Sequence, residues 1–152
     1  MIVFTLRELK CAWRQAAAVF ETADSKTKTN AHRLLLFYAV ETGLKAVLLK
    51  RLAKQDSEDL ENFFKDSGGK KKSGHDLNNL MDHLKVGTSL RLLNDRIYLD
   101  DLKLPTPPRQ RFGSCGELNQ IWRYGAKAKV PSDEMLETEL LAIQEWICGE
   151  LK

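Results

Sequence analysis

The sequence lacks the cysteine patterns that build a disulfide framework or a zinc site. Its three cysteines, Cys11, Cys115 and Cys148, are odd in number and far apart, with no CxxC or Cys/His spacing among them. The simplest interpretation is a protein with reduced thiols. We expect neither a metal ion nor another cofactor.

Signals for export and for membrane insertion are also lacking. The N-terminus MIVFTLRELK has only a short apolar run before its charges, without a basic leader region or a small-residue cleavage site. No run of about 18 apolar residues follows. The sequence therefore predicts a cytoplasmic protein with no membrane partner.

Neither sign of charge is in large excess. The 152 residues carry a formal net charge of +3 at pH 7, with 43% hydrophobic and 30% charged residues. These values are typical of a globular protein, and the small positive surplus does not by itself indicate nucleic-acid binding. The length predicts a single domain over residues 1–152.

Strand signals are scarce, because no segment alternates convincingly with a period of two and no Asn-Gly or Asp-Gly hairpin turn occurs. Helical spacing recurs instead. Residues 6–23 have one apolar face, and residues 31–54 are apolar nearly all round in their middle, which is typical of a central helix. Further helices are expected over 56–64 and 74–84, from a Ser114/Glu117 capping box, and over 131–151. The pattern predicts an all-α bundle of five or more helices.

Two segments have the composition of loops. Residues 66–74 are rich in glycine and lysine, and residues 100–114 are rich in proline. The preceding stretch is ambiguous; it is consistent with a short helix through Leu90 to Leu99, which the prolines from Pro105 to Pro108 would end. Long loops inside compact domains often have a function.

Three strings in a fixed order carry a family resemblance: FYAVETGLKAVLLKR, SGHDLNNLMDHL and IWRYGAK, followed by a terminal amphipathic helix. In this order they resemble the HEPN superfamily (higher eukaryotes and prokaryotes nucleotide-binding) over most of the chain. The resemblance implies a bundle of four or five helices that is commonly a homodimer. It also implies a place in prokaryotic toxin, CRISPR or phage-defence systems. Many members are metal-independent endoribonucleases with an R-x4-to-6-H motif, whereas others lack the motif and bind partners or nucleotides.

The nuclease motif is incomplete in this chain. No histidine follows Arg123, and the last histidine in the sequence is His83. Metal-free RNA cleavage needs groups that move protons near neutral pH, which histidine does and arginine does not. We therefore expect a non-catalytic HEPN-like interaction module that dimerises or binds a partner protein in a prokaryotic defence or toxin-antitoxin type system. The alternative is an endoribonuclease with a rearranged site around Arg123, in which Tyr124, Lys127 or His75 moves the proton.

Glu41 is the most unusual residue for its setting, since it lies amid the apolar stripe of the expected central helix. A buried carboxylate must be paired or neutralised. The resemblance suggests a polar pocket of Glu41, His75 and Arg123. The structural alternatives are a hydrogen bond from a backbone N–H to Glu41, a capping and packing role for His75, and a solvated Arg123.

Basic residues in the expected loops and at a helix end could bind the phosphates of RNA, although such charges are usually only solvated. They are Lys70, Lys71, Lys72, Arg109, Arg111, Lys127 and Lys129. Trp122 and Tyr124 are the aromatic candidates for anchors at a dimer or partner interface. Nucleotide binding without cleavage is a third possibility. It has no support from a phosphate loop, because SGGKKKSG lacks the G-x4-GK[ST] spacing.

Overall fold

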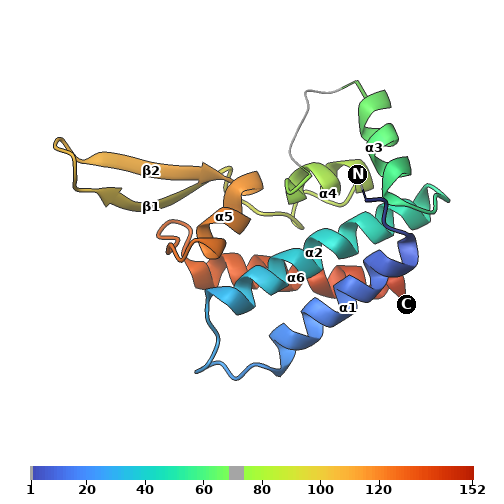
Figure 1. Ribbon diagram of the computed structural model, residues 1–152, viewed down its shortest axis with the longest axis horizontal. Coiled ribbons are helices and arrows are strands. Elements are labelled where there is room, and N and C mark those ends of the chain that lie inside the picture. Colours follow the sequence, from blue (N-terminus) through green and yellow to red (C-terminus); the bar gives the residue numbers. More distant parts are fainter. Residues whose placement is uncertain (1, 69–73) are drawn as a thin grey trace.

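The computed structural model describes residues 2–68 and 74–152, and it is mostly helical (Figure 1). Within these ranges it contains six α-helices and one two-stranded antiparallel sheet. The elements are α1 (Leu6–Thr22), α2 (Asn30–Arg51), α3 (Ser57–Asp66), α4 (Leu77–Leu84), β1 (Arg96–Leu102), β2 (Arg109–Ser114), the 3₁₀ turn η1 (Cys115–Glu117), α5 (Leu118–Arg123) and α6 (Asp133–Leu151). The mostly helical fold agrees with the class predicted from the sequence, and the sheet is an addition to it.

Polar side chains fix the starts of several helices. At α1, Glu8 N–H donates to the Thr5 hydroxyl, and the Glu8 carboxylate accepts from Thr5 N–H at 2.8 Å, which is a capping box. Asp56 and Asp76 accept backbone N–H groups in the first turns of α3 and α4. These caps satisfy donors that have no partner within the helix.

The core is built around α2, which packs against α1, α6, α4 and α5. The prediction of a central helix is confirmed, since most of its residues from Leu36 to Leu49 are buried. Close approach depends on Gly43, where an added Cβ would lie 2.8 Å from Ile147 and 2.9 Å from Trp13. Trp13 also ties α1 to α6, because its indole N–H donates to Gln144 at 2.8 Å.

The structure of residues 90–114 differs from two predictions made from the sequence. No helix runs through Leu90 to Leu99, and residues 100–114 are not an irregular loop, because β1 and β2 form a hairpin with a register shift between Leu99 and Leu102. The pairing is hard to recognise in the sequence, since β1 has no regular alternation of buried and exposed residues. Ile97 is fully buried, whereas beyond Leu99 the hairpin leaves the body and is exposed.

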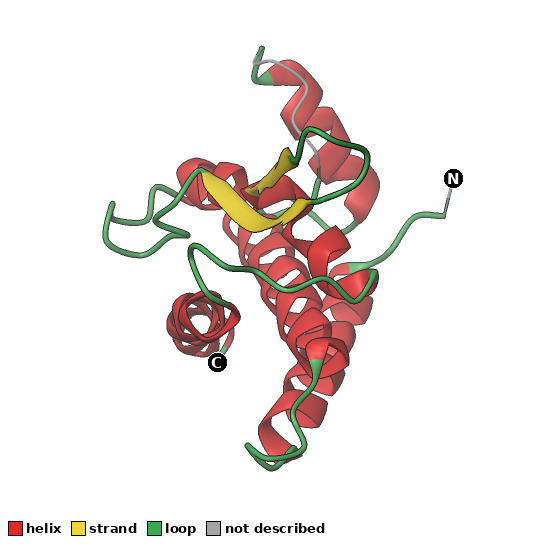
Figure 2. Ribbon diagram, turned by 90° about the vertical axis from the view of Figure 1, so that its left-hand side faces the viewer, coloured by secondary structure: helices red, strands yellow, loops and turns green. Residues whose placement is uncertain are grey.

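The hairpin projects from the helical body as an arm (Figure 1). Figure 2 views the molecule from the hairpin side, with the strands in front of the helices. At the base of the arm, Tyr98 N–H donates to the carbonyl of Val130 at 2.9 Å and the Tyr98 carbonyl accepts from Lys129 N–H at 2.8 Å. Residues 96–130 hold seven Lys or Arg and three Asp or Glu, a surplus of four that exceeds the +3 of the whole chain. The arm and its neighbours therefore carry a net positive charge.

None of the helices in the described ranges has the length and apolar character needed to cross a membrane.

Candidate functional site

The central helix buries one carboxylate, that of Glu41, which is 5% exposed. Its Oε1 accepts from Lys45 Nζ at 2.6 Å, and its Oε2 lies 2.8 Å from Nδ1 of His75. Lys45 is one turn further along α2, whereas His75 comes from the turn before α4. Glu41 is thus paired with two side chains, as a buried carboxylate requires, and not with a backbone N–H. We call Glu41, Lys45 and His75 the Glu41 cluster.

The carboxylate sets the orientation of the imidazole. Because Nδ1 of His75 faces a carboxylate, which can only accept, Nδ1 carries the proton of the neutral ring. The His75 side chain is 46% exposed, so the ring reaches solvent while its partner is buried. A histidine held in one tautomer by a carboxylate is an arrangement that can accept a proton.

Arg123 does not belong to this cluster, which corrects the three-residue pocket expected from the sequence. It is exposed at the end of α5, and its guanidinium carbon lies 5.7 Å from the centre of the Tyr124 ring. In the described part of the chain it forms no hydrogen bond or ion pair. The reason is the helix face: Ile121 and Trp122 turn toward the core and leave Arg123 on the solvent side. The structure therefore brings together Glu41 and His75 only.

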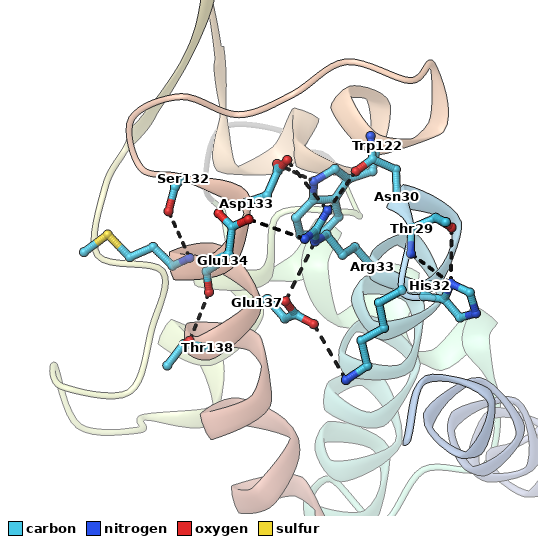
Figure 3. A network of polar contacts seen from close by, with 12 residues as sticks. Thr29, Asn30, His32, Arg33, Trp122, Ser132, Asp133, Glu134, Glu137 and Thr138 are labelled. Carbon is cyan, nitrogen blue, oxygen red and sulfur yellow. Dashed lines mark hydrogen bonds and ion pairs between the residues drawn. The ribbon is translucent and has the colours of Figure 1, made fainter. Parts of the chain in front are cut away.

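Trp122 is a core residue of this chain, which corrects its expected role as an interface anchor. It is 2% exposed, and its indole N–H donates to Asp133 at 2.9 Å (Figure 3). Asp133 also accepts from Ala128 N–H at 3.0 Å and lies 3.8 Å from Arg33. Only Tyr124, which is 75% exposed, remains available to a partner.

A groove of about 400 Å³ lies between the hairpin and α5. Its walls include residues 109–113 of β2, Leu99 and Leu102 of β1, and Gln120 and Ile121 of α5. Arg109 and Arg111 thus share one groove with apolar side chains. Arg111 is held in place because its Nε donates to the Asp100 carbonyl at 2.8 Å.

The other predicted phosphate-binding residues that the structure describes, Lys127 and Lys129, do not line this groove. Lys127 is exposed beyond α5, and Lys129 lies 3.4 Å from the Asp100 carboxylate, in an exposed ion pair that contributes little to stability. Lys70, Lys71 and Lys72 lie outside the described residues. Of the predicted set, Arg109 and Arg111 are the two that line a concave surface.

No metal centre is found in the described part of the chain, and the buried thiol of Cys115 is not activated. Across residues 2–68 and 74–152, no group of three or more His, Cys, Asp or Glu is arranged to hold a metal ion. The Cys115 thiol donates to the Asn94 carbonyl at 2.8 Å. Burial, reinforced by nearby carboxylates, raises the pKa of Cys115 to about 11, so it is a poor nucleophile at neutral pH.

Sequence reasoning missed two residues that matter here. Lys45 lies four residues after Glu41, a helical spacing that places the two side chains on one face, and this signal was readable. Arg33 lies between the acids at the start of α6, including Glu137 (Figure 3), and no sequence spacing reveals a contact between separate helices.

Comparisons with known proteins found no significant match to this chain. No protein-family model matches the chain, and no curated protein or solved structure matches it significantly. Function is therefore argued from the geometry described above.

Proposed function

We propose that this chain is a non-catalytic, HEPN-like interaction module that forms a homodimer or binds a partner protein through the hairpin and the turn after α5. The family resemblance supplies the setting, a prokaryotic defence or toxin-antitoxin type system. The observation that carries the proposal is a group of large apolar side chains on this side of the molecule, each more than half exposed: Leu104, Phe112, Tyr124 and Val130. Exposed apolar patches of this kind mark interaction sites.

Three contacts connect Phe112 and Val130, two members of this group, with their neighbours. The Phe112 ring lies 5.9 Å from the Tyr98 ring, and Tyr98 is bridged through its backbone to Val130. The guanidinium of Arg96 lies 4.8 Å from the centre of the Phe112 ring, at the edge of the apolar group. Apolar side chains with a charged rim are the usual composition of a protein interface. We call Tyr98, Leu104, Phe112, Tyr124 and Val130 the hairpin surface.

Sedimentation velocity tests the proposal. We expect the wild type to dimerise, or to sediment with a stoichiometric partner, between about 1 and about 500 µM, and the double variant Phe112→Ser/Val130→Ser to lose this association. The matched control is Val19→Ser, an exposed apolar residue on α1, which should behave as the wild type. A wild type that stays monomeric without a copurifying partner would contradict the proposal.

A second candidate function is a metal-independent endoribonuclease, and the Glu41 cluster is the observation in its favour. His75 would take the proton of the 2′-hydroxyl, Glu41 would hold its tautomer, and Lys45 would offset charge that develops on the phosphate. Since Arg123 lies outside the cluster, this site would be centred on His75. Metal-free cleavage needs both a base and an acid, and the cluster contains one histidine; we therefore rank this function below the first.

An RNase assay in EDTA separates the two functions. Wild type, His75→Ala and Arg123→Ala are compared on structured and unstructured RNA. The interaction module predicts equal background cleavage from all three proteins. Cleavage by the wild type that His75→Ala alone abolishes would establish the nuclease instead.

A further inference from the structure

Strand β2 is the open edge of the hairpin. On strand β1, the N–H and C=O of Tyr98 form hydrogen bonds with the backbone of Lys129 and Val130, so these two groups point away from β2. Tyr98 and Phe112 are directly opposite each other, and they must therefore form a non-hydrogen-bonded pair of the antiparallel ladder. It follows that the N–H and C=O of Phe112 also point outward. In the described part of the chain they have no backbone partner.

The groove lies along this open strand. Its walls include five consecutive residues of β2, from Arg109 to Gly113, together with apolar side chains such as Leu99 and Ile121. Arg109 forms no ion pair with a described residue, and the Nε of Arg111 is held by a carbonyl without neutralising its charge. An open strand edge, apolar side chains and two arginines are thus combined in one concave surface.

We propose that β2 accepts an extended acidic segment of a partner protein as a third strand, seated in the groove between the hairpin and α5. This inference rests on the proposed function and names the partner's chemistry. The outward N–H and C=O of Phe112 bind the main chain of the segment, as in other cases of strand addition. Alternate side chains of the segment then lie toward the groove, where carboxylates meet Arg109 and Arg111 and apolar side chains contact Leu99 and Ile121.

Charge argues for this occupant over a second copy of the chain. Two copies pairing along β2 would bring the Arg109 and Arg111 residues of both chains into one short sheet. Like charges across neighbouring strands are destabilising. An acidic segment instead neutralises them.

The groove also suits a peptide better than RNA. Phe112 is the only aromatic side chain in the wall, and its ring already contacts the guanidinium of Arg96. Binding of single-stranded RNA relies on free aromatic faces in a basic groove.

Fluorescence anisotropy with three labelled probes tests the inference on the full chain. They are a heptapeptide of sequence VVEEVVE, in which each face of the extended chain carries both valine and glutamate, the same peptide with lysine for glutamate, and a short oligouridylate. We expect the acidic peptide to bind, and the other two to bind at least about tenfold more weakly. Arg109→Ala/Arg111→Ala should weaken the acidic peptide by about tenfold or more.

A pair of variants isolates the backbone contact. Phe112→Pro removes the outward N–H at a position where an edge strand accepts proline, and Phe112→Ala removes the ring but keeps the N–H. We expect the acidic peptide to bind the proline variant about fivefold more weakly than the alanine variant, with both folded by circular dichroism. Equal affinities would overturn strand addition.

The outcomes of these binding experiments can be distinguished from the outcomes of the experiment that tests the proposed function. Failure of the acidic peptide to bind, or tighter binding of the oligouridylate or the lysine peptide, would overturn the acidic-strand inference. A wild type that shows neither self-association nor a copurifying partner in sedimentation, measured without any peptide, would instead contradict the interaction module.

Discussion

Trp122 and Asp133 join the end of α5 to the start of α6 through a buried hydrogen bond of 2.9 Å. The same Oδ1 of Asp133 accepts the N–H of Ala128, and its other oxygen lies 3.8 Å from Arg33 of α2 (Figure 3). One carboxylate thus fixes two helices and the turn between them. This turn leads to Lys129 and Val130, which hold the base of the hairpin.

Removing the Asp133 carboxylate should therefore be costly. Asp133→Ala leaves the Trp122 and Ala128 donors buried without an acceptor, and we expect the free energy of unfolding to fall by about 2–4 kcal/mol. Glu134→Ala is the matched control, since Glu134 also lies 3.8 Å from Arg33 but is exposed; it should change stability by less than about 0.5 kcal/mol. Urea denaturation followed by circular dichroism measures both, and similar losses in the two variants would contradict the assignment.

The close packing of α2 against α1 and α6 predicts a contrast between two glycines. Gly43→Ala should destabilise the protein by about 1–3 kcal/mol, because the new methyl group would overlap Ile147 and Trp13. Gly149→Ala has no neighbour within 4 Å and should stabilise α6 by up to about 1 kcal/mol. Thermal unfolding decides the matter: a Gly43→Ala protein as stable as the wild type would mean that the helices pack less closely than described.

Glu139 on α6 predicts a dependence of stability on pH. Both of its carboxylate oxygens are buried, and this burial raises the pKa of Glu139 above the ordinary value of 4.5, although the nearby Leu93 backbone N–H offsets part of the rise. The folded chain then holds this proton more tightly than the unfolded chain does. The free energy contributed by the group is present at low pH and is lost as pH rises through the raised pKa.

We therefore expect Glu139→Gln to be more stable than the wild type at about pH 7 and to lose that advantage at about pH 4, where both side chains are neutral. Glu145→Gln, on the exposed side of the same helix, serves as the control and should alter stability little at either pH. Denaturant titrations at the two pH values provide the test. An advantage of Glu139→Gln that persists unchanged at about pH 4 would rule out titration of Glu139 as its cause.

The Glu41 cluster predicts the tautomer of His75. At about pH 8.5, where an ordinary imidazole is neutral, nitrogen-15 NMR should find the proton on Nδ1 of His75 in the wild type. Replacing the acceptor in Glu41→Ala should return the ring toward the Nε2–H form. His83, whose ring contacts Phe63 and Phe64, should give the same signal in both proteins. A wild-type His75 with its proton on Nε2 would show that Glu41 does not orient the ring.

The helices could be predicted because their signals are local. The apolar face of residues 6–23, the all-round apolar middle of α2 and the Ser114/Glu117 capping box each depend on neighbours in the sequence. The hairpin escaped prediction because only Ile97 of β1 is fully buried and its turn is built from prolines in place of an Asn-Gly pair. Pairing along such strands depends on contacts that are distant in the sequence.

The candidate site could be predicted in part from the sequence. Glu41 stood out because a carboxylate in an apolar stripe must find a partner, and His75 was named as one such partner. Arg123 was grouped with them by a resemblance in sequence order, but its helix face directs it to solvent. The helical spacing of Leu118, Ile121 and Trp122 already indicates which face of α5 is apolar, and it leaves Arg123 off that face, in agreement with the structure.

The hairpin and the helices have different roles in the structure of the chain. Its strands pair mainly with each other, while the helices hold the hydrophobic core. Changes at the tip, residues 103–108, leave that core untouched. Under the proposed function, recognition and folding would depend on largely separate residues, so exposed positions of the hairpin could change without loss of the fold.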